Sequence, residues 1–506
     1  MLTAGLCCAG SLLQACQTTE SPTGARPDVV IESPADAPRP PFEFSPSDQQ
    51  FLDRVQRGAF LYLWNEVSPT TGMVRDRSSS PVISIAGVGF QLSGIPIGIE
   101  RGWITRDQGL ARATLILESL LNNPANRKAG LFYHFLDPVT AGPASGAYEH
   151  TVSTIDSALL FAGVITAGNY FGGGVESLSN RIIREANWRF FVLRQSEKPY
   201  EIGYISLGWQ PGTPADPTGE GTLLPYVWAD SGDEHRLVMF LAAAAPSEEF
   251  RVDPALYYRL RRQLGDAGTS RDPAQTVVWF PWSGALFTGF FAHCWINYSA
   301  MEPDDPAAFG AAHRARVDWW ENSRRLARMH ERKCRDNPLG LPTFGPDAWG
   351  LSASDAPGGY AVPGLFPEPL PMPGATPQFD FSTFTVHDNF GDGTLAPYAA
   401  GCCIMFSPRP AIAALRHYLS LARTGAAASL WREPDGKRGN YGFQDAFNLG
   451  KQWVAPDCVA IDQGPLLLAI ENARTGRVWQ WFESDKGVVA AYERLRFAKR
   501  ASGAPR

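Results

Sequence analysis

The stretch from residue 148 to residue 171, YEHTVSTIDSALLFAGVITAGNYF, combines acidic side chains with the start of an apolar helix. Past Ser153 the apolar residues recur at helical spacing, which predicts a buried helix. Ser153 followed three residues later by Asp156 fits a capping signature, so we expect Asp156 in the first turn. If helical geometry extends back to Tyr148, then Glu149, Ser153 and Asp156 share one face and could present two carboxylates to a cavity. The structural alternative is that Asp156 only caps the helix and Glu149 lies in a solvated loop.

Further acids lie beside aromatic residues in loops that contain glycine and proline. A sugar site requires flat aromatic faces that stack on the C–H surfaces of pyranose rings, and polar groups that hold hydroxyls. Each of these acids, taken singly, also fits a turn or capping role. Glu234 differs because it opens an apolar helix. With Ser153, the candidate substrate-binding residues are Asp76, Arg77, Trp209, Trp228, Asp233, Trp349, Asp355, Asp392 and Asp462.

Length and composition indicate a large folded body. The chain has 506 residues, of which 44% are hydrophobic and 12% aromatic, and no linker divides it into separate domains. The formal net charge is −6 and no long basic run occurs, so neither nucleic acid nor an anionic membrane surface is indicated as a partner. A neutral ligand fits this charge better.

The cysteines do not form a metal or disulfide pattern. Of eight cysteines, three lie before residue 17, which leaves an odd number in the body and excludes a fully paired framework. No C-x-x-C motif and no His/Cys pair at zinc-ligand spacing occurs in the body. We therefore expect small buried thiols, no metal site and no cofactor.

The N-terminal residues read as a targeting segment. Residues 1–16 hold a short apolar stretch that ends at Cys16, and they resemble a bacterial lipoprotein signal with Cys16 as the lipidated residue. Residues 17–45 are rich in Pro, Ser, Thr and Ala, which predicts a disordered tether. The expected location is extracytoplasmic: periplasmic, membrane-anchored through Cys16, or secreted. No later stretch approaches the 18 or so uninterrupted apolar residues of a membrane span.

From residue 46 to residue 490 helical patterns follow one another with almost no alternating strands, which predicts an all-α body followed by a tail at 491–506. Ala158, Ala162 and Gly163 permit close packing of the helix near residue 160. No sequence repeat of fixed period appears, which argues against a solenoid and favours one closed toroid of helical hairpins. The expected helices are 47–66, 87–101, 105–122, 152–171, 177–194, 231–245, 285–298, 308–333, 395–405, 409–423 and 460–474.

A series of segments in this body resembles the glycoamylase-like domain family, whose characterised members include the endo-β-1,2-glucanases of glycoside hydrolase family 144. The resemblance spans about residues 50–483 and rests on nine segments in the same order. They are FLYLWNEVSPTTGMVRDRS (60–78), GVGFQLSGIPIGIERGWITRDQ (87–108), STIDSALLFAG (153–163), WADSGDEHRLVMFLAAAAP (228–246), ALFTGFFAHCWINY (285–298), WGLSASDAPGGY (349–360), DGTLAPYAA (392–400), YGFQDAFN (441–448) and AIDQGPLLLAIENARTG (460–476).

The resemblance implies an (α/α)6 toroid with an acidic, aromatic cleft at one end. Where this chain has Asp156 the glucanases have a Glu, and where it has Ser153 they have an Asp. The acid further upstream corresponds to Glu149. The later helix begins with a Glu in the relatives, which corresponds to Glu234, with Asp233 as the competing position. The STID version also resembles the related domain of cyclic β-1,2-glucan synthases, which perform transglycosylation.

The resulting hypothesis is a glycoside hydrolase that acts on β-glucan, with β-1,2-glucan as the candidate substrate and an oligo- or polysaccharide as its partner. Glycoside cleavage needs one protonated acid near the leaving oxygen and a second carboxylate that activates water or attacks the sugar. Glu149 or Asp156 would be one partner and Glu234 the other. The alternatives are a β-1,2-glucan transglycosylase and a non-catalytic glycan-binding lipoprotein.

Overall fold

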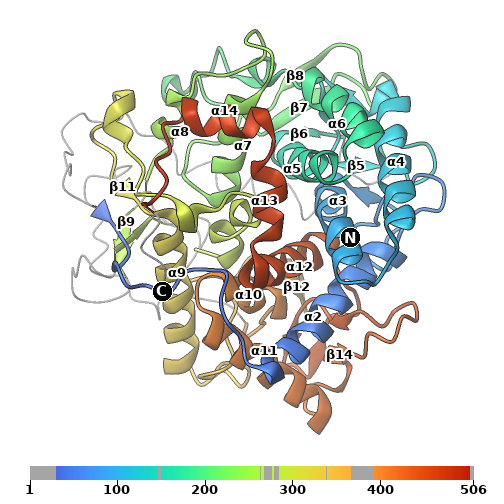
Figure 1. The fold of residues 1–506 in the computed structure, drawn as a ribbon, viewed down its shortest axis with the longest axis vertical. Helices are drawn as coiled ribbons and strands as arrows, with labels where there is room; N and C mark the ends of the chain where they lie inside the picture. The colour runs from blue at the N-terminus through green and yellow to red at the C-terminus, as the bar shows by residue number, and fades with distance from the viewer. Residues whose placement is uncertain are drawn as a thin grey trace.

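The computed structural model describes residues 30–145, 150–262, 264–266, 276–278, 284–337, 339–365 and 392–501. Helices α2 to α14 account for most of the ordered elements, and the strands among these residues are two to four residues long (Figure 1). The prediction of a mostly helical body is therefore confirmed. No helix in the described ranges combines the length and apolarity needed to cross a membrane.

An inner layer of helices forms the core. It consists of α3 (Ile85–Glu100), α5 (Thr154–Phe171), α7 (Asp233–Ala244), α10 (Pro397–Cys402) and α12 (Ala460–Thr475), and almost every residue of these helices is buried. Their sequences are apolar on all sides, as a helix surrounded by protein requires. Neighbours in this layer pack in the order α7, α5, α3, α12 and α10.

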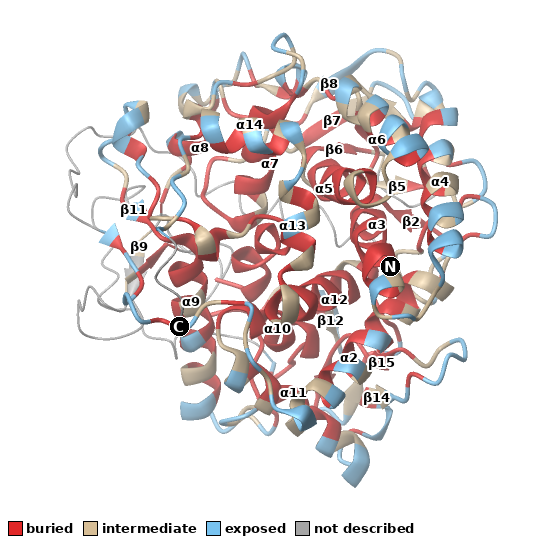
Figure 2. Ribbon diagram, in the orientation of Figure 1, coloured by how far each residue is buried: buried red, intermediate tan, exposed pale blue. Residues whose placement is uncertain are grey.

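A second layer of amphipathic helices covers the first. Helix α2 packs on α12, α6 on α5 and α11 on α10, while α4 packs on α6, and their outward faces are exposed (Figure 2). The covering and connecting helices are α2 (Pro46–Asn65), α4 (Arg106–Asn122), α6 (Gly173–Glu185), α8 (Ala255–Arg259), α9 (Trp319–Asp336), α11 (Pro408–Thr424), α13 (Arg477–Glu483) and α14 (Lys486–Arg494).

Helices α3 and α5 touch through their backbones at two glycines. A Cβ on Gly89 would lie 2.1 Å from the carbonyl oxygen of Leu159, and a Cβ on Gly163 would lie 2.0 Å from the carbonyl oxygen of Gly89. Neither distance can accommodate a side chain, so both positions require glycine. The predicted close packing around Gly163 is confirmed, and it sets the spacing of the two central helices.

Short strands fix the segments that precede the inner helices. β2 directly precedes α3, and β6 directly precedes α5. The pairs are β1 (Val30–Ile31) with β11 (Arg316–Val317), β2 (Ile83–Ser84) with β5 (Phe135–Leu136), β3 (Arg127–Lys128) with β4 (Leu131–Phe132), β9 (Leu264–Asp266) with β10 (Thr276–Val278), β12 (Ser354–Ala356) with β13 (Gly359–Ala361), β14 (Trp431–Arg432) with β15 (Gly442–Phe443), and β16 (Phe447–Asn448) with β17 (Trp453–Val454); β7 (Gly208–Pro211) lies between β6 (Val152–Ser153) and β8 (Gly221–Leu223).

One expected helix is wrong. Residues 285–298 form short 3₁₀ turns, η6 (Leu286–Gly289), η7 (Ala292–Cys294) and the start of η8 (Tyr298–Ala300). Their backbone N–H groups bond to partners elsewhere in the fold: that of Leu286 donates to the Leu351 carbonyl at 3.0 Å, and that of Ala292 donates to the Asp233 carboxylate. These tertiary bonds replace the bonds that a continuous α-helix would make.

The expected limits of the body are also corrected. The predicted tether of residues 17–45 is wrong for residues 30–45, because β1 pairs with β11 and the Phe42 N–H donates to the Ala473 carbonyl at 2.7 Å. The predicted tail from residue 491 begins too early, since α14 runs to Arg494 and Leu495 is fully buried. The cysteines of the body are buried thiols, as expected: Cys294, Cys334, Cys402, Cys403 and Cys458.

Candidate active site

Carboxylates converge where the inner helices begin. Asp156, Glu234 and Asp462 lie in the first turns of α5, α7 and α12, where the positive end of the helix dipole favours a negative charge. Loop residues add further acids, and each member interacts electrostatically with at least one other. This acidic cluster consists of Asp76, Asp156, Glu234, Asp355, Asp445 and Asp462.

Asp156 is held from both sides. Ser153 is the N-cap of α5: its hydroxyl oxygen accepts the Asp156 N–H at 3.2 Å, and its hydroxyl donates to Asp156 Oδ2. On the other side His134 Nε2 lies 3.5 Å from Asp156 Oδ1. The capping role predicted for this pair is confirmed. Because the helix begins only at Thr154, the premise of a helical face that extends back through residues 150–153 is wrong.

Glu234 is a half-buried acid without a counter-ion. Among the residues that the structure describes, its carboxyl makes no hydrogen bond and no ion pair. Burial raises its pKa well above the usual value, and the negative charges of Asp156 and Asp233 raise it further. Both effects favour the protonated form of Glu234.

The preceding residue, Asp233, has a structural role and is not accessible to a ligand. Its carboxylate is completely buried, pairs with Arg236 and accepts the backbone N–H groups of Ala292 and His293. Burial raises its pKa to about 6 despite these partners. The prediction that Asp233 binds substrate is therefore wrong, and of the two competing acids only Glu234 remains a candidate.

Arg77 is the main cation among these acids. Its Nη1 lies 2.5 Å from Asp355 Oδ1, and its Nε lies 3.5 Å from Asp76 Oδ2. The loop is fixed to the start of α12, because the Ala460 N–H donates to the Asp76 carbonyl at 2.8 Å. Burial raises the pKa of Asp76, while Arg77 and His134 offset that effect only in part. The structure thus brings together Asp76, Arg77 and Asp355, three of the candidate substrate-binding residues.

Asp445 and Asp462 form a buried carboxyl pair. Asp445 accepts the backbone N–H of Asp355 at 2.7 Å, and its side chain also contacts Asp462. Burial raises the pKa of Asp445 to about 6 and, together with the charge of Asp445, raises that of Asp462 well above its usual value. Two buried carboxyls in contact cannot both ionise, so the pair retains one proton near neutral pH.

The predicted aromatic platforms are mostly core residues. Trp349 is fully buried and Trp209 is 1% exposed, so neither ring can stack on a sugar, and their predicted roles are wrong. Trp228 is half-buried at the edge of the site, where its indole N–H donates to Thr154 Oγ1 at 2.8 Å.

Asp392 is exposed and accepts the N–H and hydroxyl of Thr394, which is a turn-capping contact outside the acidic cluster. Two other predicted residues, Glu149 and Cys16, lie outside the described residues.

Three residues of the site were missed by sequence reasoning. No motif in the sequence marks His134. Asp445 and Tyr360 lie in YGFQDAFN and WGLSASDAPGGY, two segments that carry the family resemblance but do not single out either residue. Tyr360 is paired with Asp355 in the β12–β13 hairpin, is 42% exposed, and lies within electrostatic reach of Asp462, Asp445 and Glu234. It presents an exposed aromatic ring next to the acidic cluster. In the described ranges, no group of three His, Cys, Asp or Glu residues could hold a metal ion.

The fold and the site define a helical protein with clustered carboxylates suited to acid–base chemistry. The chain belongs to the glycoamylase family: the model of that family, described as "Putative glucoamylase", matches residues 226–486. A curated relative is the exo β-1,2-glucooligosaccharide sophorohydrolase (non-reducing end) of Parabacteroides distasonis, which is 26% identical over 479 residues. That match covers 90% of this chain but 58% of the relative, so the chain spans little more than half of that protein.

Solved structures show the same fold. The endo-β-1,2-glucanase from Chitinophaga pinensis, in complex with sophorotriose and glucose, superposes with a TM-score of 0.70 at 21% identity, covering 90% of this chain and 99% of that one. A β-1,2-glucanase from Parabacteroides distasonis superposes with a TM-score of 0.70 at 23% identity, covering 90% of this chain and 60% of that one. At these identities the likeness establishes the fold.

Proposed function

We propose that the protein is a glycoside hydrolase that cleaves β-1,2-glucan, with Glu234 as the proton donor and Asp156 as the second carboxylate. The observation that carries the proposal is the half-buried carboxyl of Glu234, which has no partner among the described residues and interacts electrostatically with Asp156. The linkage is supported by the relatives, which are named for β-1,2-linked glucans.

Glu234 provides the proton that the leaving glycosidic oxygen needs. An acid catalyst must still be protonated at the working pH, and burial with two negative neighbours raises the pKa of Glu234 in that direction. Since no basic residue among those described neutralises it, the proton can pass to the substrate without breaking an internal ion pair.

Asp156 provides the negative charge that the oxocarbenium-like transition state requires. The Ser153 hydroxyl donates to Asp156 Oδ2 and His134 Nε2 lies 3.5 Å from Asp156 Oδ1, so the carboxylate is held in one orientation. The anomeric configuration of the first product, measured by NMR, reports whether this carboxylate activates water or attacks the sugar.

Arg77, Asp76 and Asp355 would hold sugar hydroxyls, with Tyr360 as a stacking surface. The Arg77–Asp355 ion pair presents donors and acceptors in a fixed geometry, and fixed polar groups bind a ligand at a smaller entropic cost than mobile ones. We also propose that the two helical layers form an (α/α)6 toroid, for which the alternation of buried and amphipathic helices is the support. An extracytoplasmic location with lipidation at Cys16 is proposed from the sequence of residues 1–16.

The test is to incubate the full chain with linear and cyclic β-1,2-glucan beside β-1,3-, β-1,4- and α-linked glucans, following products by chromatography. Glu234→Gln should abolish product formation while the protein still binds the glucan. Glu118→Gln, which changes an exposed acid on the outer helix α4, is the matched control and should cleave normally. Cyclic or lengthened products would replace the proposal by transglycosylation, and no product from any β-1,2-glucan would contradict it.

A further inference from the structure

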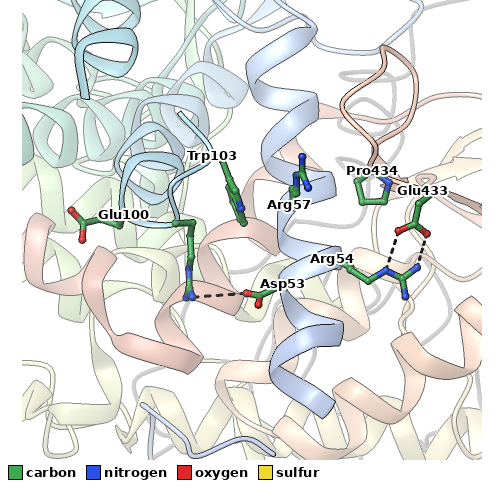
Figure 3. A pocket seen from close by; sticks show the side chains of 8 residues that line it. Asp53, Arg54, Arg57, Glu100, Trp103, Glu433 and Pro434 are labelled. Atoms are coloured by element: carbon green, nitrogen blue, oxygen red, sulfur yellow. Dashed lines mark hydrogen bonds and ion pairs between the residues drawn. The ribbon is translucent and has the colours of Figure 1, made fainter. Parts of the chain in front are cut away.

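A polar pocket, drawn in Figure 3, lies at the opposite end of α3 from the acidic cluster. Its volume is about 450 Å³, and it lies between α2, the end of α3 and the loop after β14. Helix α3 begins beside the acidic cluster and ends at Glu100 in the pocket wall, so its 16 residues separate the two sites by about 24 Å. We call it the far-end pocket; its lining residues are Asp53, Arg54, Arg57, Glu100, Arg101, Trp103, Glu433 and Pro434.

Trp103 gives the far-end pocket an aromatic surface. The ring is half-buried, and its inner side packs on Phe60 with the ring centroids 5.2 Å apart. Within the described part of the chain its indole N–H has no hydrogen-bond partner. An amphipathic ring fixed on one side and open on the other offers a face for stacking and a donor at its edge.

Two acceptors in the pocket are fixed by arginines. Arg54 donates from Nε and Nη2 to the two oxygens of Glu433 at 3.0 and 2.5 Å. Asp53 lies 2.7 Å from Arg474 and 4.0 Å from Arg101. Each carboxylate is thereby held in place yet remains about half exposed, with lone pairs free for a ligand.

Arg57 supplies free donors. It is exposed on the same face of α2 as Asp53 and Arg54, one turn further along the helix (Figure 3). Its guanidinium makes no hydrogen bond or ion pair with any described residue. The pocket therefore combines an open aromatic face, fixed acceptors and a fork of unused donors.

This chemistry fits a neutral polyhydroxylated ligand. The lining has three arginines and three acids, so it does not favour a charged ligand, while adjacent hydroxyls can bond to the guanidinium and to a carboxylate together. We propose that the far-end pocket is a second, non-catalytic glucan-binding site that holds another segment of the chain cleaved at the acidic cluster. This proposal rests on the proposed function for the identity of the sugar. A glucan bound at both sites is held more tightly than one bound at a single site, so the far-end pocket increases the affinity for long glucans.

The first test compares a long β-1,2-glucan with a short β-1,2-linked trisaccharide, which can occupy only one site. Trp103→Ala and Arg57→Ala should lower kcat/KM for the long glucan relative to that for the trisaccharide by about tenfold. Trp64→Ala is the matched control, because Trp64 also packs on Phe60, at 5.9 Å, but does not line the pocket. It should leave that ratio unchanged. Arg57 is exposed, so Arg57→Ala keeps the test valid even if Trp103→Ala impairs folding.

The second test measures binding directly and does not depend on catalysis. Calorimetric titration of the Glu234→Gln protein with the trisaccharide should show two sites, of which Trp103→Ala or Arg57→Ala removes one and Trp64→Ala removes none. A single site in the Glu234→Gln protein, or two sites that both persist in the Trp103→Ala and Arg57→Ala variants, would overturn the inference. The two proposals can fail separately. If the unaltered protein cleaves no glucan but still binds the trisaccharide at a site that Trp103→Ala removes, the proposed function is wrong and the far-end binding site is supported.

Discussion

The two ends of the inner helices differ in how their acidic side chains are paired. At their N-terminal ends six acids face Arg77 and His134, and Glu234 has no partner among the described residues. At the other end acids are matched by arginines: Glu471, completely buried, accepts two bonds from Arg101, and Glu433 accepts two from Arg54. Unmatched buried acids destabilise a fold, and their concentration at one end of the described structure supports the proposal that this end is the active site.

The same contrast occurs between two consecutive residues. Asp233 is paired with Arg236 and two backbone donors, while the charged groups that act on Glu234 within the described structure, Asp156 and Asp233, are both negative. The chain therefore uses one acid to fix the start of α7 and leaves the next one reactive.

The largest effect should come from removing the reactive acid. Replacing Glu234 with Gln should lower kcat on β-1,2-glucan by about 10³-fold, because the leaving oxygen loses its proton donor. The unfolding free energy should stay the same or rise, since a strained carboxyl is removed. Product release by chromatography measures the first quantity and denaturant unfolding the second. A stable variant that retains full activity would show that Glu234 is not the acid.

Replacing Asp233, whose carboxylate is fully paired, should lower stability rather than activity. Asp233→Asn removes the charge that pairs with the buried Arg236, which should cost about 3 kcal/mol or more of unfolding free energy. Denaturant unfolding measures this loss. If Asp233→Asn abolished activity without loss of stability, the division of roles between Asp233 and Glu234 would be wrong.

The carboxyl pair should make stability depend on pH. The folded pKa of Asp445, about 6, lies above its unfolded value, so its contribution is fully present below about pH 4 and is lost as the pH rises through 6. The two-unit shift corresponds to about 3 kcal/mol. As the pH rises from 4 to 8, Asp445→Asn should therefore lose less stability than the unaltered protein, and the difference in Tm between the two proteins separates the titration of the Asp445–Asp462 pair from that of groups elsewhere. A constant difference across that range would contradict the shared proton.

The smallest effect should come from the end of the inner helices at which acids are paired with arginines. Arg54→Ala breaks an ion pair with Glu433 whose side chains are 35% and 57% exposed, so it should cost about 0.5 kcal/mol, and less at high salt. Thermal unfolding at low and high ionic strength measures both quantities. A loss above about 2 kcal/mol would mean that the ends differ less than their charge pairing implies.

Local sequence signals predicted the elements that depend on local physics. The Ser153–Asp156 cap, the small residues around Gly163 and the acid at the start of α7 were all recognisable, because capping and helical periodicity act within a few residues. The order of family segments placed Asp76, Arg77 and Asp355 in the right region.

The predictions that were wrong concern residues whose contacts are made with partners distant in the chain. Whether Trp349 faces a sugar or the core is decided by helices that pack around it, and periodicity carries no such information. Asp445 enters the site because Asp355, 90 residues earlier, donates to it. Residues 285–298 have an apolar helical pattern, yet Asp233 captures their backbone donors. Tertiary hydrogen bonds overrode local preference in each of the last two cases.

The glycine contact between α3 and α5 limits how this protein can change. Any side chain at Gly89 or Gly163 would collide with a backbone carbonyl and push the two helices apart. The helix starts that carry Ser84 and Asp156 would then move with them, so one methyl group in the core would alter a site more than a full helical turn away. Directed evolution of new substrate preference should therefore leave this seam untouched and vary the hairpin that carries Asp355 and Tyr360.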